Sequence, residues 1–287
     1  MRMTRRSGKI LYVKNDEPDN YIGPSFLQEL KKNVNIKLYD FVTVSETSSY
    51  IAQHVSFVLL EIGIFVLFSH ERLSPLPVLM FLMCGVGFCY LIYHLYLEES
   101  CCDSKPSTTK TVVNDLRRAS LLASLVFILS PVLNTLTAEI SSDTIYALST
   151  LCFLLNVLFH NYGTYSSLLF SPISLNCGIF VSVLLASRLD GTAHTFTMVI
   201  QAFVFFAYAP KFTERMRDKY PLKTVYANIL ITIFVTIAFA FISLVAFCLI
   251  FLLFISILLL LPYVFVRMQK MKNTIHGPWD EAVLAVD

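Results

Sequence analysis

Long runs of apolar residues, separated by short polar stretches, dominate the chain from about residue 50 onwards. Each run is long enough, or nearly so, to cross about 30 Å of hydrocarbon as a helix. The pattern therefore predicts an all-α fold, a bundle of transmembrane helices. The first six spans are expected at 51–69, 75–97, 119–138, 143–160, 164–186 and 192–210.

A longer uncharged run follows, from Thr224 to Val266. At 1.5 Å per residue it would form a helix of about 64 Å, twice the thickness of the bilayer core. The run therefore predicts two spans joined by a tight turn, which we expect near Ser243. The total is about eight spans, and seven or nine stay open because the fourth span is short.

Basic residues are spread unevenly over the segments between these spans. With both termini on the cytoplasmic side, 20 of the 22 Lys and Arg residues fall in cytoplasmic segments, and Arg72 and Arg188 fall outside. Such a bias is typical of membrane proteins. We therefore expect a cytoplasmic segment 1–49, a transmembrane bundle 50–266 and a cytoplasmic tail 267–287.

Composition supports the membrane assignment. The chain is 56% hydrophobic and 15% charged, whereas soluble domains carry about 25% charged residues. The net charge of +2 and the lack of a basic, aromatic-rich stripe argue against a nucleic-acid partner. The polar first 49 residues lack the apolar core of a cleavable signal peptide, and the seven cysteines lack the spacing of a disulfide framework or metal site.

The two polar ends offer candidate contact surfaces. Ser25 and Gln28 have the spacing of a capping box, and the apolar residues that follow, Leu30 and Val34 among them, predict an amphipathic helix over 25–38. Such a helix suits a membrane surface or a partner, and equally a helix folded onto the protein's own spans. In the tail, we expect His276, Trp279 and Asp280 to contact headgroups or a partner protein.

Glu61 is the acidic residue deepest in any predicted span. An ionisable group there costs a few kcal/mol unless it faces the bundle or a partner, so we expect a hydrogen-bonded structural role or a contact with another subunit. Pro131 removes a helical hydrogen bond, which Ser130 or Asn134 could help replace. The run Ser171–Pro172 predicts a second interrupted helix, which suits either helix packing or a transport site.

No enzyme motif is present. The chain lacks an Asp-x-Asp pair for a metal-bound nucleotide sugar, a nucleophile elbow, a phosphate-binding loop and a dinucleotide fingerprint. His54, His94 and His160 are isolated along the sequence, without the spacing of metal ligands. We therefore expect no catalytic residue, metal or cofactor site of the chain's own.

Several short strings carry a resemblance to a known family. They are PDNY (18–21), SPVLNTLT (130–137), SDTIYALS (142–149), SLN (174–176), LASRL (185–189) and the tail IHGPWDEA (275–282). In this order they resemble the PIG-C family of phosphatidylinositol N-acetylglucosaminyltransferase subunits. Asn134 stands where lysine is expected in relatives.

The resemblance implies residence in the endoplasmic reticulum membrane and a part in the first step of GPI-anchor synthesis. In that step N-acetylglucosamine passes from UDP-N-acetylglucosamine to phosphatidylinositol. The implied partners are the catalytic subunit PIG-A, the subunits PIG-H, PIG-P, PIG-Q and PIG-Y, and phosphatidylinositol itself. A lipid transporter or scramblase, and a transferase that works alone, are the alternative interpretations of the sequence.

The charge bias generates a topological prediction. Epitope tags at residue 8, within 101–110 and after 284 should all be reached from the cytosol in selectively permeabilised cells. A lumenal result for any one of them would overturn the eight-span topology.

Overall fold

A computed structural model of the chain describes residues 31–32, 38–94, 108–135, 137, 139–163, 170–271 and 275–276. The chain divides into two compact units. The larger unit is Asp40–Val264, and the smaller combines Met1–Tyr39 with Phe265–Asp287.

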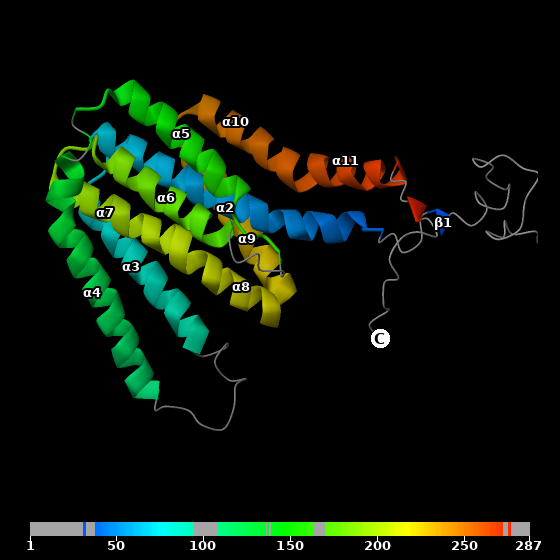
Figure 1. The fold of residues 1–287 in the computed structure, drawn as a ribbon, viewed down its shortest axis with the longest axis horizontal. Coiled ribbons are helices and arrows are strands. Elements are labelled where there is room, and N and C mark those ends of the chain that lie inside the picture. The colour runs from blue at the N-terminus through cyan, green and yellow to red at the C-terminus, as the bar shows by residue number, and fades with distance from the viewer. Residues whose placement is uncertain are drawn as a thin grey trace, which may run out of the picture. The chain divides into compact units, whose positions relative to one another are not determined.

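The described chain is almost entirely helical, which confirms the all-α prediction (Figure 1). The α-helices are α2 (Phe41–Ser69), α3 (Pro75–Ile92), α4 (Thr108–Thr135), α5 (Ser142–Leu158), α6 (Phe170–Ala186), α7 (Thr192–Ala202), α8 (Ala209–Lys219), α9 (Pro221–Ala240), α10 (Leu244–Ile255) and α11 (Leu261–Met268). Among the described residues, six continuous helices are long and apolar enough to cross a membrane, and α5 and α6 are shorter apolar helices. The count of eight spans stays a prediction.

Two π-helical segments join consecutive α-helices into longer ones. Segment η3 (Phe203–Tyr208) joins α7 to α8, and η4 (Ser256–Leu260) joins α10 to α11. Each precedes a proline, Pro210 or Pro262. Proline cannot donate to the carbonyl four residues earlier, and a wider turn accommodates that loss without breaking the helix.

The long uncharged run turns where the sequence predicts. Helix α9 ends at Ala240, and Ser243 in an extended conformation precedes α10. By contrast, the segment 211–223, which separates the expected span 192–210 from the uncharged run, is not a loop, because α8 continues to Lys219 and Pro221 already begins α9. Proline fits the first turn of a helix, where its missing N–H needs no partner. Helix α2 likewise begins at Phe41, well before the expected boundary.

In the smaller unit, a strand from the N-terminal part of the chain pairs with a strand from the C-terminal part. Strand β1 (Lys31–Lys32) lies antiparallel to β2 (Ile275–His276). The predicted helix over 25–38 is therefore wrong at Lys31 and Lys32, where pairing with the tail overrides the local apolar periodicity. In the same unit, the backbone N–H of Tyr39 donates to Oε1 of Gln269 (2.7 Å), and Nε2 of Gln269 donates to the Tyr39 carbonyl (3.1 Å).

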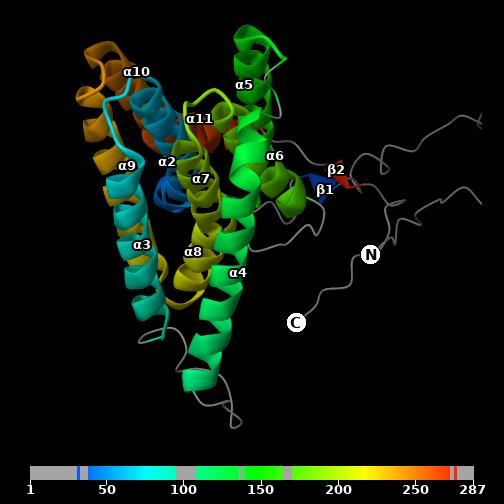
Figure 2. The same cartoon turned by 90° about the vertical axis from the view of Figure 1, so that its left-hand side faces the viewer.

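Helix α2 lies at the centre of the larger unit (Figures 1 and 2). On one side it packs against α9 and η4, in a core that includes Ala52 and Val235. On the other side it packs against α5, α6 and α7, in a core that includes Phe65 and Met198. Because α2 belongs to both cores, it holds the two halves of this unit together.

The outer helices expose large apolar side chains. In α3, Leu82 is the sole buried side chain among the described residues, and α4, α9 and α10 each expose a row of Leu, Ile and Phe. A soluble protein rarely exposes so much contiguous apolar surface. These faces are suited to lipid chains or to helices of other subunits.

The turn between α4 and α5 is stabilised by hydrogen bonds from residues that lie far away in the sequence. The guanidinium of Arg188 donates to the carbonyls of Ile140 (2.6 Å) and Thr137, and the Thr137 hydroxyl bonds that of Ser187. The family-like strings around residues 137 and 187 therefore meet in space. Arg188 is one of the two basic residues expected on the non-cytoplasmic side, and this contact gives it a structural role there.

Close packing of α6 against η3 generates a stability prediction. A methyl group at Gly178 would approach the Phe206 ring to 2.7 Å, closer than real contacts allow, and would lie 3.0 Å from Asn156 Nδ2, which is a tight contact. Gly178→Ala should therefore lower stability by about 1–3 kcal/mol through overpacking. A lowered midpoint of thermal unfolding in detergent would show it.

Gly85→Ala is the matched control. Nothing lies within 4 Å of a methyl group placed at Gly85, in the middle of α3. Alanine is the better helix former by up to about 1 kcal/mol, so this variant should unfold at the same or a slightly higher temperature. Equal effects of the two substitutions would contradict the close packing at Gly178.

Candidate functional site

Polar side chains buried in the larger unit gather along α2. Ser49, Gln53 and Ser56 recur at spacings of four and three, and His54 and Glu61 lie two turns apart on a neighbouring face. All five are buried. In an apolar medium each such group needs a partner within the protein, and α2 finds these partners on several surrounding helices.

His54 links α2 to α5 and α6. Its Nε2 lies 2.9 Å from Oδ1 of Asn156, whose Nδ2 donates to the Ser174 carbonyl (2.7 Å), and the Ser174 hydroxyl donates back to the Asn156 carbonyl (2.8 Å). Because the Asn156 amide nitrogen is directed at Ser174, its oxygen faces the histidine. His54 therefore carries its proton on Nε2.

His160 stacks on His54. The two imidazole rings lie nearly parallel, with centroids 3.8 Å apart, and Tyr162 meets both edge-on. Burial raises the pKa of Tyr162, whose hydroxyl donates to the Val157 carbonyl (2.8 Å).

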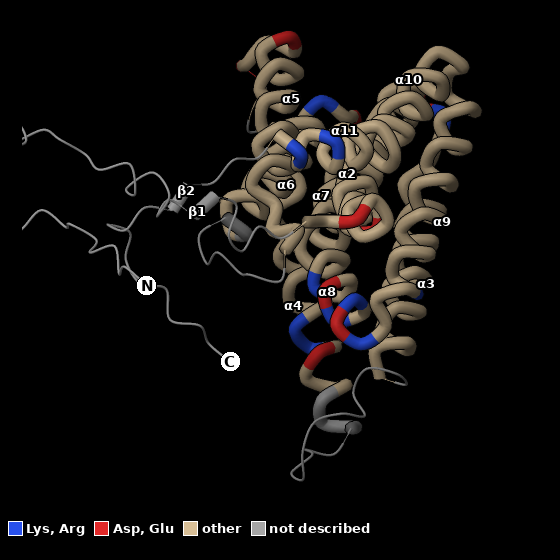
Figure 3. The backbone as a smooth tube through the Cα atoms, turned by 90° about the vertical axis from the view of Figure 1, so that its right-hand side faces the viewer, with Lys and Arg blue, Asp and Glu red and all other residues tan. Residues whose placement is uncertain are grey.

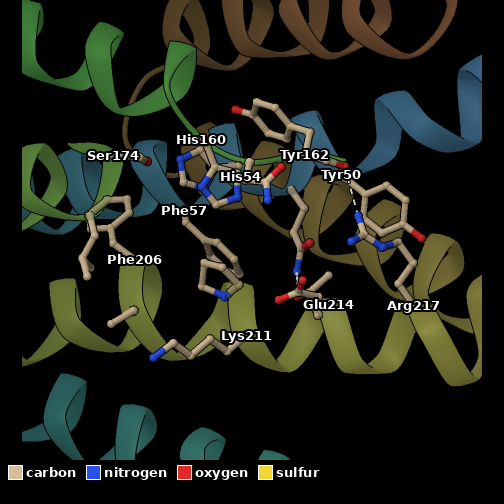
Figure 4. A pocket seen from close by; sticks show the side chains of 16 residues that line it. Tyr50, His54, Phe57, His160, Tyr162, Ser174, Phe206, Lys211, Glu214 and Arg217 are labelled. Carbon is tan, nitrogen blue, oxygen red and sulfur yellow. Dashed lines mark hydrogen bonds between the residues drawn. The ribbon is translucent and has the colours of Figure 1, made fainter. Parts of the chain in front are cut away.

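These residues border a pocket of about 120 Å³ between α2 and α8 (Figure 4). The stacked histidines and Tyr162 lie on one side of it, Phe57 and Phe206 lie at one end, and residues of α8 form the opposite edge. The lining residues are Tyr50, Gln53, His54, Phe57, His160, Asn161, Tyr162, Ser174, Leu175, Phe206, Ala207, Pro210, Lys211, Thr213, Glu214 and Arg217. We name this cavity the α2–α8 pocket.

Arg217 holds the connection 159–163 in place beside the pocket. Its guanidinium donates to the carbonyls of Tyr162 (3.0 Å) and Gly163 (3.4 Å) and lies 5.1 Å from the centre of the Tyr50 ring. Gln53, another lining residue, donates from Nε2 to the Thr213 hydroxyl on α8 (2.9 Å). The pocket walls are therefore held rigidly by internal bonds.

Two charged groups at the α8 edge have no such bonds. Lys211 and Glu214 lie about one turn apart, both exposed. Within the part of the chain that the structure describes, neither forms a hydrogen bond or an ion pair. The pocket thus presents one free ammonium and one free carboxylate beside an aromatic wall.

The pocket does not have the arrangement of a hydrolase or metal site. Its serine and threonine hydroxyls are engaged with carbonyls, and His54 donates to an amide rather than to a nucleophile. Among the described residues, no three His, Cys, Asp or Glu side chains lie together in a way that could hold a metal ion. The described lining offers aromatic faces, hydrogen-bonding groups and two charged groups, which can bind a polar ligand.

Glu61 lies apart from the pocket, deeper along α2. It is fully buried, and Nε2 of Gln201 donates to its Oε2 at 2.8 Å. Ser182, also fully buried, places its hydroxyl beside the same carboxyl group. The residue therefore has the hydrogen-bonded position inside the bundle that the sequence suggests, whereas a contact with another subunit would require an exposed side chain.

The remaining predicted residues do not converge on one site. Pro131 lies exposed near the end of α4, and the Ser130 hydroxyl donates to the Val126 carbonyl, not to the carbonyl that the proline frees. Asn134 lies in the same last turn. His276 lies in β2. Leu30, Val34, Trp279 and Asp280 lie outside the described residues.

The expectation of a second interrupted helix is wrong. Helix α6 begins at Phe170, so Pro172 falls in its first turn. There the missing N–H of proline costs no hydrogen bond. Pro131 likewise leaves α4 intact for a further turn.

Sequence reasoning missed the pair His54 and His160, which it treated as isolated. A stacking contact between residues 106 positions apart leaves no pattern along the chain. One signal was present: Gln53, His54, Asn156 and Gln201 are polar residues within apolar runs. Such residues usually face the bundle interior and mark functional or structural contacts.

The buried Glu61–Gln201 pair generates the next prediction. Glu61→Gln keeps an acceptor for Gln201 and should give a monodisperse protein in detergent, whereas Glu61→Lys opposes its partner's donor and should reduce the yield of folded protein severalfold. Size-exclusion chromatography would measure both. Glu139→Lys makes the same charge change at an exposed position and should behave as wild type.

A different result would assign Glu61 to chemistry. If Glu61→Gln abolished the activity of an assembled complex without reducing its yield, a proton-handling role would replace the structural one.

Comparisons with known proteins agree over the length of the chain. The family model described as "GPI2: Phosphatidylinositol N-acetylglucosaminyltransferase" matches residues 8–280. The C subunit of phosphatidylinositol N-acetylglucosaminyltransferase from Homo sapiens is 34% identical over 279 residues, which cover 97% of this chain and 93% of the human one. No solved structure matches the chain.

More distant organisms give the same result. The GPI2 subunit of phosphatidylinositol N-acetylglucosaminyltransferase from Schizosaccharomyces pombe is 31% identical over 285 residues, covering 96% of this chain and 86% of its own. A protein of Dictyostelium discoideum, named as the putative C subunit of the same transferase, is 32% identical over 282 residues, covering 96% and 78%. Taken with the helical bundle and the family-like strings that meet at Arg188, these matches show that the chain belongs to the PIG-C/GPI2 family of phosphatidylinositol N-acetylglucosaminyltransferase subunits.

Proposed function

We propose that this chain is a non-catalytic membrane subunit of the complex that transfers N-acetylglucosamine from UDP-N-acetylglucosamine to phosphatidylinositol, the first step of GPI-anchor synthesis. The observation that carries the proposal is the use of the buried polar groups. They bond mainly to one another and hold helices together, as the His54–Asn156–Ser174 chain does. A scaffold needs such rigidity, whereas a transferase needs reactive groups facing its substrates.

The proposed place of work is the endoplasmic reticulum membrane. The exposed apolar faces of α3, α4 and α10 suit either lipid or the membrane helices of other subunits. The proposed partners are the catalytic subunit PIG-A and the subunits PIG-H, PIG-P, PIG-Q and PIG-Y, with phosphatidylinositol as the lipid. In this arrangement the sugar nucleotide is bound by the catalytic subunit on the cytoplasmic side.

A lipid transporter or scramblase has little support. Transporters of the kind considered have helices broken near the middle of the membrane, where unwound backbone binds the substrate. Here Pro172 lies in the first turn of α6, and Pro131 lies close to the end of α4. Neither helix is interrupted midway.

Enzymatic assays of the isolated chain test the proposal. Purified alone in lipid, it should neither transfer N-acetylglucosamine to phosphatidylinositol nor hydrolyse UDP-N-acetylglucosamine, because its described residues offer no donor site. Co-expressed with the catalytic subunit, it should co-purify with transferase activity.

Turnover by the isolated chain would contradict the proposal if it were lost on substitution of one of the chain's own acids, such as Glu214→Gln. Failure to co-purify with any transferase subunit would contradict it in a second way, since a scaffold must bind what it supports.

A further inference from the structure

We infer that the α2–α8 pocket binds the headgroup of a membrane phospholipid in which a phosphodiester carries an uncharged, ring-shaped polyol, as in phosphatidylinositol. The inference rests on the proposed function and deepens it by assigning the lipid to a site on this subunit. It follows from the position, charge, wall chemistry and size of the pocket.

The position is suited to a headgroup. Basic residues of α4 and α8 gather at the same end of these helices (Figure 3). In membrane proteins such residues lie at the level of the lipid headgroups. The pocket lies beside α8 at this end, lined by Lys211, Glu214 and Arg217. A lipid in the surrounding leaflet can therefore reach the pocket with its headgroup.

The charges match a monoanionic phosphodiester. Among the described residues that line the pocket, Lys211 and Arg217 carry a positive charge and Glu214 a negative one, which leaves one net positive charge. The Arg217 guanidinium is engaged with the carbonyls of Tyr162 and Gly163, so Lys211 is the cation whose donors are open to a phosphate. One net positive charge balances one phosphodiester charge. A nucleoside diphosphate would bring at least two charges, which such sites normally balance with several cations or a metal ion.

The walls match a polyol ring. The aromatic and imidazole rings of Phe57, Phe206, His54 and His160 provide flat apolar surfaces, against which the C–H face of a saturated ring can pack. The free carboxylate of Glu214 can accept hydrogen bonds from ring hydroxyls.

The size of the pocket limits how much of a ligand it can enclose. Its volume of about 120 Å³ is that of a small polar group such as a six-membered polyol with part of its phosphate. The acyl chains would remain in the membrane outside it, and most of a sugar nucleotide would likewise lie outside.

The test measures lipid binding to the full-length chain in detergent by native mass spectrometry. Wild-type protein should bind phosphatidylinositol about tenfold more tightly than phosphatidylglycerol, which has the same charge without the ring, or phosphatidylethanolamine. Because Lys211 faces the phosphodiester that both anionic lipids share, Lys211→Gln should weaken the binding of phosphatidylinositol and phosphatidylglycerol alike, severalfold, and remove the preference over phosphatidylethanolamine. Lys223→Gln, the same charge change on α9 outside the pocket, should leave it unchanged.

A second variant closes the pocket without changing its charge. Ala207 lines the pocket and is partly exposed, so Ala207→Leu adds three carbons into the open space. It should reduce phosphatidylinositol binding at least severalfold while the thermal unfolding midpoint and the binding of phosphatidylglycerol stay near wild type.

Three results would overturn the inference: equal binding of the three lipids, tighter binding of phosphatidylethanolamine, or phosphatidylinositol binding that survives both pocket variants. Competition by soluble glycerophosphoinositol as strong as that of the lipid would also overturn it, because the ligand would then come from solution. Co-purification with the transferase is measured separately, so a failure here would leave the scaffold role standing.

Discussion

The need to satisfy polar groups inside an apolar medium organises the larger unit of this structure. Helix α2 carries Gln53, His54 and Glu61 as buried side chains within the bundle, where their hydrogen-bond partners must come mainly from the protein itself. Their partners, Thr213, Asn156 and Gln201, come from helices far away in the sequence. Each bond therefore fixes the position of one helix relative to α2. Apolar packing alone would discriminate less well between alternative arrangements, since lipid chains are as apolar as the helix surfaces.

The same principle explains the contact at Arg188. A turn between two helices leaves backbone carbonyls without helical partners. The guanidinium satisfies those of Thr137 and Ile140 from a different helix, and so determines where α5 begins relative to α4. Basic residues are rare on the predicted non-cytoplasmic side of the membrane, and the hydrogen bonds to the turn explain why Arg188 is present there.

The same polar contacts between helices also form the walls of the α2–α8 pocket. The hydrogen bonds of Arg217 and Asn156 hold the 159–163 connection and the start of α6 in place. Because His160 lies in this connection, the same bonds position the stacked histidines as one wall of the pocket. Lys211 and Glu214 are left unpaired at the edge, within the part of the chain that the structure describes. A rigid aromatic wall with two free charges is a binding surface that needs little rearrangement when a ligand enters, which favours affinity.

The sequence by itself determined the fold class, the positions of the apolar helices, the turn before Leu244 and the burial of Glu61 with a polar partner, because hydropathy and chain length act locally. It also carried the family resemblance. It did not determine that β1 pairs with β2 or that His54 and His160 stack, since those contacts join segments up to 245 positions apart. The tertiary structure decided the pocket for the same reason: its walls come from four separate stretches of chain, and their approach to one another is set by hydrogen bonds between helices, which no local pattern encodes.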